Sequence, residues 1–122
     1  MAAAAVAAAF SRSWRFLPGT RSANGLYLYG ATDNVIRRNK WHDNQDTGQH
    51  LQSGADNNVS VNNLSWNNGD HGYDHLGASG TIHVGDVAYG NFKDGFSIEG
   101  SSPNTVLSRS NFVCVVMERS FS

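Results

Sequence analysis

Apolar and polar residues alternate in short stretches between residues 24 and 112, and glycine divides these stretches at a nearly constant spacing. Gly25, Gly48, Gly72 and Gly95 are separated by 23, 24 and 23 residues. A fixed period of this length is typical of one structural unit that is repeated along an axis. The pattern therefore predicts a repeat architecture.

Each repeat offers three short alternating stretches. The first follows the glycine, and its inward positions in the first repeat are Leu26 and Leu28. Roughly eight residues for each strand and turn are too few for a crossover helix. We therefore predict a three-sided coil whose strands pair in parallel with their copies one turn away, at about 4.8 Å. The predicted interior of the other two sides comprises Val59, Val61, Leu64, Trp66, Ile82, Val84, Val87 and Tyr89.

The first repeat departs from this pattern, because Arg37, Lys40 and His42 occupy columns that are mostly apolar elsewhere. A shift of one residue would instead turn Ile36 and Trp41 inward. Both registers stay open for this repeat, which is predicted to be an irregular end turn or a place where a neighbouring coil packs.

Asparagine follows the same period. Stacked side-chain amides can hydrogen-bond from one turn to the next, and asparagine tolerates sharp bends. A structural role is therefore predicted for two columns, in the first of which Thr81 takes the place of one asparagine: Asn34, Asn58 and Asn104, and Asn44, Asn68 and Asn91.

The composition limits the possible partners and divides the chain. The 122 residues allow one domain, and a net charge of −1 with 16% charged residues gives no basic patch for nucleic acid. No apolar run is long enough to span a membrane. Residues 1–23 form an Ala- and Arg-rich leader outside the repeat, residues 24–112 the repeats and residues 113–122 an irregular tail. The coils at the two ends are predicted to be open, so self-association through unpaired strand edges is expected.

The leader admits more than one interpretation. Its positive charges follow the apolar run, whereas a secretory signal places them before it. An acid-free stretch of Ala, Ser and Arg also resembles an organellar transit peptide, and a short Ala-rich helix is a third interpretation.

Several segments resemble the repeats of right-handed parallel β-helix proteins of the pectin-lyase-like type, which are secreted and mostly bacterial. These segments are residues 24–28 (NGLYL), 57–63 (NNVSVNN) and 69–74 (GDHGYD). The resemblance implies an all-β, right-handed parallel β-helix of about four coils and an extracellular or cell-surface location in a bacterial protein. The uncapped terminal coils indicate a piece of a longer protein. Because the family includes lyases, hydrolases, epimerases and non-catalytic surface proteins, the resemblance does not choose an activity.

The candidate site lies on the predicted outer face of the first stretch. Strand parity places there the residues two before, two after and four after each glycine, and the glycine itself is expected to leave a shallow trough. Stacked like charges repel one another unless a cation or a lysine lies between them. The candidate residues on this face are Asp46, Asp70, Asp74, Lys93, His50 and Glu99.

The resemblance implies roles for these residues. Asp46, Asp70 and Asp74 would bind Ca²⁺, Lys93 would remove the proton beside a uronate carboxylate, and His50 and Glu99 would contact the polysaccharide. A hydrolase using Asp70 and Asp74 is less favoured, because four residues along a strand separate them by roughly 13 Å.

A third interpretation is a solvated polar face on a structural or glycan-binding module, with Lys93 paired to Asp70. Intervals of 23 or 24 residues leave no long loop to wall a cleft, which weakens the case for an enzyme. His75 is predicted to be a neutral core histidine between Leu51 and Ile98.

Overall fold

The computed structural model describes residues 23–113, which form twelve short strands. Apart from Ala23 and Val113, the predicted leader and tail lie outside the described residues. The strands are β1 (Leu26–Tyr29), β2 (Val35–Arg37), β3 (Lys40–His42), β4 (Gln49–Gln52), β5 (Val59–Val61), β6 (Leu64–Trp66), β7 (Tyr73–Leu76), β8 (Ile82–Val84), β9 (Val87–Tyr89), β10 (Phe96–Glu99), β11 (Val106–Ser108) and β12 (Asn111–Val113).

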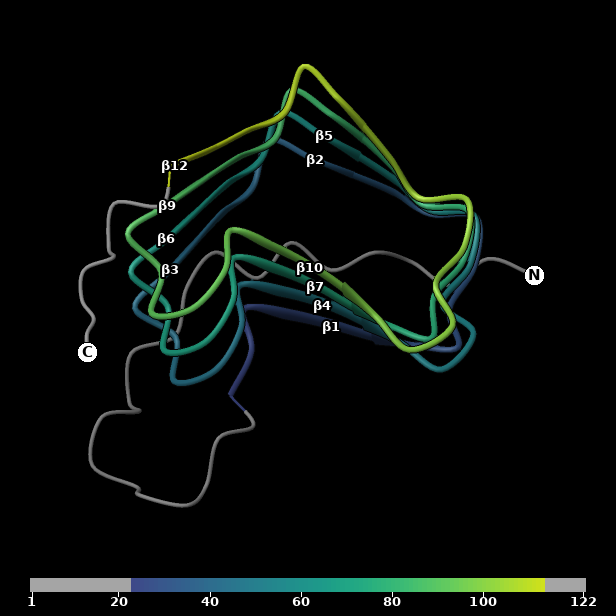
Figure 1. The fold of residues 1–122 in the computed structure, drawn as a ribbon, viewed down its shortest axis with the longest axis horizontal. Helices are drawn as coiled ribbons and strands as arrows, with labels where there is room; N and C mark the ends of the chain where they lie inside the picture. The colour runs from purple at the N-terminus through teal and green to yellow at the C-terminus, as the bar shows by residue number, and fades with distance from the viewer. Residues whose placement is uncertain (1–22, 114–122) are drawn as a thin grey trace.

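The strands form three parallel sheets, each with one strand from every coil. The sheet orders are β1-β4-β7-β10, β2-β5-β8-β11 and β3-β6-β9-β12. Figure 1 looks along the stack, so the four coils lie nearly over one another and enclose a three-sided interior. The predicted all-β fold of about four parallel coils is therefore confirmed. Among residues 23–113, no helix could serve as a membrane span.

The predicted interior of the second and third sheets is wrong by one residue. In the first three coils, the middle residue of each three-residue strand points inward: Ser60 and His83 are fully buried, whereas Ile82 and Tyr89 are 39% and 38% exposed. The remaining members of the predicted set are partly exposed. The one-residue shift considered only for the first coil thus applies to the first three coils, and Ile36 and Trp41 are buried.

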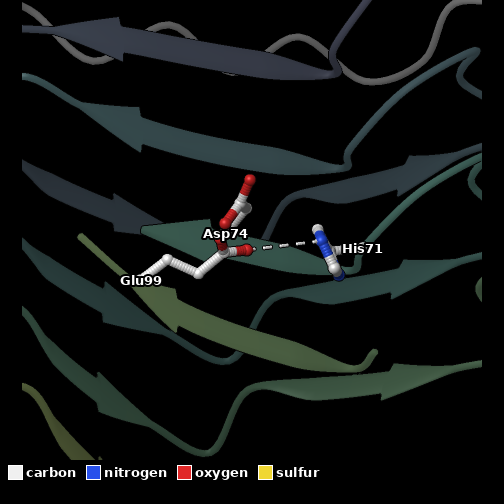
Figure 2. A group of neighbouring side chains, drawn as sticks. All are labelled: His71, Asp74 and Glu99. Atoms are coloured by element: carbon white, nitrogen blue, oxygen red, sulfur yellow. Dashed lines mark ion pairs between the residues drawn. The ribbon is translucent and has the colours of Figure 1, made fainter. Parts of the chain in front are cut away.

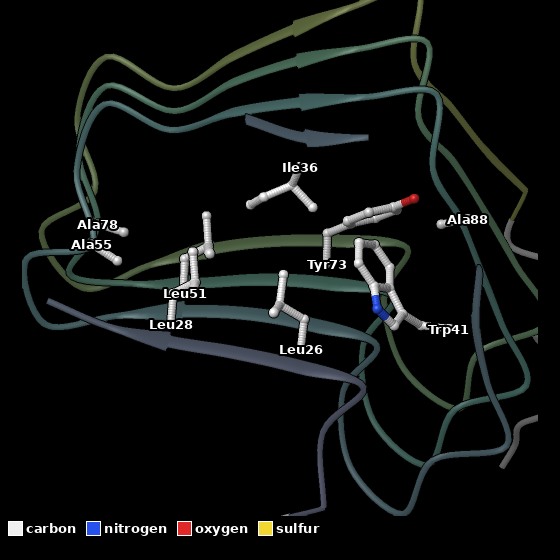
Figure 3. Packing of buried hydrophobic residues seen from close by; sticks show 9 residues of the cluster. All are labelled: Leu26, Leu28, Ile36, Trp41, Leu51, Ala55, Tyr73, Ala78 and Ala88. Atoms are coloured by element: carbon white, nitrogen blue, oxygen red, sulfur yellow. The ribbon is translucent and has the colours of Figure 1, made fainter. Parts of the chain in front are cut away.

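In the first sheet the side chains point inward and outward as predicted, and they supply most of the apolar core. Leu26, Leu28 and Leu51 line this side of the interior (Figure 3). Tyr73 packs edge-on against Trp41, with ring centroids 6.1 Å apart. His75 is fully buried and pairs in register with Leu51 and Ile98, which confirms its predicted place.

The periodic glycines are explained by close packing inside the coil. A Cβ atom added at Gly72 would lie 2.7 Å from the carbonyl oxygen of Gly95 and 2.9 Å from Cβ of Ala88. At Gly48 it would collide with Ser65 Oγ. The glycines therefore make room for inward side chains of the third sheet, and the trough predicted on the outer face is not their role.

Asparagine ladders run along the corners of the solenoid, as predicted. Asn68 Nδ2 donates to Asn91 Oδ1 at 2.9 Å, and Asn34 Nδ2 donates to Asn58 Oδ1 at 3.1 Å. Asn104, however, does not belong to the ladder. Because β11 pairs through Val106 with Ile82, the fourth coil is shifted by one residue, and Asn104 is an exposed turn residue with φ of 61°.

A third ladder, which the sequence analysis missed, ends in a buried carboxylate. Asn39 donates to Asn63 at 3.1 Å, and Asn63 Nδ2 donates to Asp86 Oδ1 at 3.0 Å. Asp86 Oδ2 lies 2.6 Å from His83 Nδ1, and His83 Nε2 lies 2.8 Å from His75 Nε2. A chain of polar groups thus crosses the interior.

The hydrogen-bond partners determine which nitrogen of each imidazole carries the proton in this row of polar groups. His83 Nδ1–H donates to the carboxylate, so His83 Nε2 accepts from His75 Nε2–H. His75 Nδ1 is then a bare lone pair, and it is buried without a hydrogen-bond partner. Burial, with the neighbouring His83 and His50 as smaller causes, lowers the pKa of His75 to about 3.

The parity of the second sheet can be tested on two adjacent residues. Ile36 is 1% exposed and Val35 is 58% exposed. Ile36→Asp should lower the free energy of unfolding by about 3–5 kcal/mol, because it buries an unpaired charge. Val35→Asp should change it by about 0.5 kcal/mol, as other surface substitutions do. Urea unfolding followed by circular dichroism measures both, and equal losses would contradict the assigned parity.

The buried histidine chain predicts acid sensitivity. A histidine in the unfolded chain titrates near 6.5, whereas His75 titrates near 3 in the folded chain, so the unfolded state binds more protons between these values. The stability contributed by neutral His75 is present above pH 6.5 and lost as the pH falls toward 3, on the order of 5 kcal/mol in all. His75→Leu should flatten this loss in unfolding experiments at several pH values, and an unchanged pH profile would contradict it.

Candidate functional site

The outward faces of the first and second sheets differ in chemistry. The second sheet exposes apolar residues, with Val35, Ile82 and Val106 between 39% and 58% exposed. The first sheet instead presents histidine, carboxylate and hydroxyl side chains from all four coils. In-register pairing stacks Tyr27 on His50, His50 on Asp74 and Asp74 on Ser97. This outer face of β1-β4-β7-β10, called the polar face below, contains the predicted site.

Asp70 and Lys93 form an ion pair on this face. Lys93 Nζ lies 2.9 Å from Asp70 Oδ1, and the lysine side chain is 49% exposed. The main chain also joins the two residues, because Lys93 N–H donates to the Asp70 carbonyl at 2.9 Å. A lysine held by a carboxylate on an accessible face offers a positive charge to a ligand, and the role of Lys93 as a base stays a prediction.

His71 is a residue of the site that the sequence analysis did not select. Its Nε2 lies 3.7 Å from Asp70 Oδ2 and 3.8 Å from Glu99 Oε2, and its Nδ1 lies 3.5 Å from Asp94 Oδ2. The imidazole is buried, but it faces this group of carboxylates on the outside of the coil. Because His71 comes just before Gly72, at the bend into β7, strand alternation could not assign its direction.

Asp74 and His50 lie at the centre of the polar face. Their side chains are 10% and 13% exposed, and Asp74 Oδ2 lies 3.6 Å from His50 Nε2. Burial raises the pKa of Asp74 and lowers the pKa of His50, so both shifts favour the uncharged forms. Asp74 Oδ1 and His50 Nε2 are buried and have no hydrogen-bond partner.

One group of potential metal ligands occurs among the residues that the structure describes. Ligand atoms of His71, Asp74 and Glu99 lie within 4.8 Å of one another. Figure 2 shows the three side chains converging over the sheet, with the His71–Glu99 ion pair as a dashed line. Glu99 is further held by Ser97, whose Oγ donates to Oε2 at 2.6 Å.

This group differs from the ligand set predicted for Ca²⁺. Asp74 is common to both sets, Asp70 is paired with Lys93, and Asp46 lies outside the group. Calcium prefers oxygen ligands, and the group includes an imidazole nitrogen. The chemistry of these donors therefore fits Ca²⁺ poorly, and the Asp46, Asp70 and Asp74 site stays a prediction.

Two tyrosines extend the polar face on the first coil. Tyr27 and Tyr29 are 48% and 65% exposed, and their ring centroids lie 6.2 Å apart. Tyr27 also packs against His50, with centroids 5.3 Å apart, and its hydroxyl donates to Gln52 Oε1 at 3.0 Å. Exposed aromatic rings thus lie directly beside the titratable groups.

Comparison with known proteins gives one result. A family model described as a right handed beta helix region matches residues 13–115. No curated protein matches the chain, and no solved structure matches it.

The buried carboxylate of Asp74 predicts a stability gain on substitution. Its pKa is raised, so the ionised form destabilises the folded chain at neutral pH. Asp74→Asn should therefore raise the free energy of unfolding at pH 7 by about 1 kcal/mol, as stabilising changes in functional sites commonly do. Urea unfolding measures the change. Asp33→Asn, on an exposed turn, is the matched control and should have little effect, and destabilisation by Asp74→Asn would contradict the prediction.

Proposed function

The chain belongs to the right-handed β-helix family, and we propose that its polar face binds polysaccharide. The observation that carries this proposal is the placement of two exposed tyrosines, Tyr27 and Tyr29, beside a stacked array of carboxylate, imidazole and ammonium groups on one sheet. Aromatic rings with polar edges and convergent hydrogen-bonding groups are the chemistry with which proteins hold sugars.

The tyrosines supply the apolar part of the contact. A sugar ring has faces of C–H groups that pack on an aromatic ring, while its hydroxyl groups need polar partners nearby. Gln52 holds the Tyr27 hydroxyl, and His50 packs against the Tyr27 ring. These contacts reduce the entropy that the Tyr27 side chain would lose on binding.

The charges on the polar face indicate which polysaccharides it would bind. Four carboxylates lie on or beside the polar face, from Asp70, Asp74, Asp94 and Glu99, and Lys93 is already paired with the first of them. Carboxylates accept hydrogen bonds from sugar hydroxyls but repel uronates. We therefore expect neutral, hydroxyl-rich chains to bind directly, and acidic chains to need a divalent cation.

A second candidate function is lyase-like elimination on a uronate chain. His50, whose pKa is lowered by burial, is a neutral imidazole, and Lys93 would neutralise the uronate carboxylate. The proton beside that carboxylate would pass to the imidazole as the glycosidic C–O bond breaks and a C=C bond forms, and the departing sugar oxygen would take a proton from water. This function ranks second because His50 Nε2 is buried beside Asp74.

A polysaccharide partner would fit the extracellular or cell-surface location expected from the resemblance. Both the location and the partner belong to the proposal, as does self-association through the ends of the solenoid. The proposal requires only the face described above, because Tyr27, Tyr29, Lys93 and Glu99 are all accessible on it.

Binding to polysaccharides tests the proposal. Affinity electrophoresis with galactan, xylan, pectate and alginate, each with and without a divalent cation, should detect binding to at least one chain. Tyr27→Ala and Tyr29→Ala should each weaken it about fivefold, which corresponds to about 1 kcal/mol for one aromatic contact. Tyr89→Ala, on the third sheet, is the matched control and should leave binding unchanged.

The same samples separate the two candidate functions. Binding without any rise in ultraviolet absorbance from unsaturated uronates supports the binding module. A rise with pectate or alginate that disappears in Lys93→Ala favours the lyase. Absence of binding to all four chains, or equal weakening by Tyr89→Ala, would contradict the polysaccharide face.

A further inference from the structure

We propose that His71, Asp74 and Glu99 bind one divalent transition-metal ion of the zinc class. The inference concerns the ion alone and does not depend on the polysaccharide proposed above. It rests on the distances between the three ligand atoms, on the mixed nitrogen and oxygen donors, and on a buried carboxylate oxygen that lacks a partner.

The distances are those of ligands around an ion and not of groups that bond to each other. His71 Nε2 and Glu99 Oε2 are 3.8 Å apart, which is too long for a hydrogen bond. Ligands about 2.1 Å from a tetrahedral ion are about 3.4 Å from one another. A small inward movement of Glu99, whose side chain is 53% exposed, would bring the two atoms to that separation.

Asp74 gives the independent observation. The residue is 7% exposed, and its Oδ1 has no hydrogen-bond partner, although a buried carboxylate oxygen ordinarily has one. The same carboxylate approaches the ligand atoms of His71 and Glu99. An ion would satisfy the oxygen and offset the cost of burying the charge. His50 Nε2, buried and 3.6 Å from Asp74 Oδ2, is the nearest candidate for a fourth ligand.

The surrounding groups hold the ligands in place. Ser97 Oγ donates to Glu99 Oε2 at 2.6 Å and so orients that carboxylate. The main-chain N–H of Asp94 donates to His71 Nδ1 at 3.3 Å, so the free imidazole carries its proton on Nε2. A metal ion on Nε2 would require this proton to move to Nδ1, where the Asp94 carboxylate, with Oδ2 at 3.5 Å, would replace the main-chain N–H of the same residue as its partner.

The donor set indicates the class of ion. One imidazole and two carboxylates suit borderline divalent metals, whereas Ca²⁺ takes six or more oxygens. For such donors the affinity for Zn²⁺ exceeds that for Mn²⁺. We therefore expect Zn²⁺ to bind more tightly than Mn²⁺, and at least about tenfold more tightly than Ca²⁺.

Calorimetric titration of the full chain with ZnCl₂, MnCl₂ and CaCl₂, without polysaccharide, tests the site. One Zn²⁺ per chain is expected. His71→Gln, Asp74→Asn and Glu99→Gln should each weaken Zn²⁺ binding by at least about tenfold, because each removes one ligand. His42→Gln is the matched control, since His42 also lies beside a carboxylate, with Nδ1 2.7 Å from Asp43 Oδ2, but on the third sheet. It should leave the affinity unchanged.

Three results would overturn the proposal: no Zn²⁺ binding by the wild-type chain, unchanged binding by all three ligand variants, or tighter binding of Ca²⁺ than of Zn²⁺. If a substitution at the buried His71 or Asp74 prevents folding, Glu99→Gln still tests the site, because the Glu99 side chain is half exposed. A Zn²⁺ site without polysaccharide binding would uphold this inference and refute the proposed function. The reverse result would refute the inference alone.

Discussion

The fold depends on the in-register parallel pairing of each strand with its copy one coil away. Val59, for example, lies between Val35 and Ile82, so each position of one coil meets the equivalent position of the next. Hydrogen bonds between carbonyl and amide groups continue through the bends, as where Asp70 N–H donates to the Asp46 carbonyl and Lys93 N–H to the Asp70 carbonyl. Parallel pairing at strands and bends alike leaves side chains of one kind stacked in columns, and the properties of the molecule follow from what each column contains.

Inside the coil, this stacking makes a narrow core in which polar groups must satisfy one another. Gln49 and Asn63 both donate to Ser60 Oγ at 2.9 Å, and Asn63 continues to Asp86. The carboxylate then orients His83, and through it His75. Such a network specifies one register, because a slip of one strand would leave several buried groups unpaired. Because this network requires His75 to be uncharged, the stability of the fold falls when acid protonates histidine.

The period of the glycines was enough to predict the fold, but not the direction of every side chain. In β5 the residues Val59 and Val61 are apolar, and Ser60 between them is fully buried. The pattern suggested the reverse, because β-branched residues favour strands on either face. Three-residue strands between corner asparagines offer too few alternations to resolve this. The insertion of one residue before β11 likewise moved Asn104 out of its column, since the turn at Pro103 and Asn104 is one residue longer than its equivalent in the coil before.

The candidate site was predictable where strand alternation holds and unpredictable at the bends. His50, Asp74 and Glu99 lie on regular strands, and all three lie on the predicted face. His71 lies at a bend, where its direction depends on the packing around Gly72 and on the hydrogen bond from Asp94. The sequence could supply the residue types but not the contacts that turn an imidazole outward.

The stacking that builds the core also concentrates charge on one outer face. Strands about 4.8 Å apart bring side chains of successive coils closer than a Debye length, so their charges interact strongly. Lys93 reduces this repulsion at Asp70, because its Nζ lies 2.9 Å from Asp70 Oδ1. Asp74 Oδ1, in contrast, is buried without a hydrogen-bond partner. A fold that needed only stability would place a neutral side chain there. The buried carboxylate, which lies beside the imidazole of His50, would be stabilised by the metal ion proposed above, and this distinguishes the polar face from the outer face of the second sheet, which exposes Val35, Ile82 and Val106.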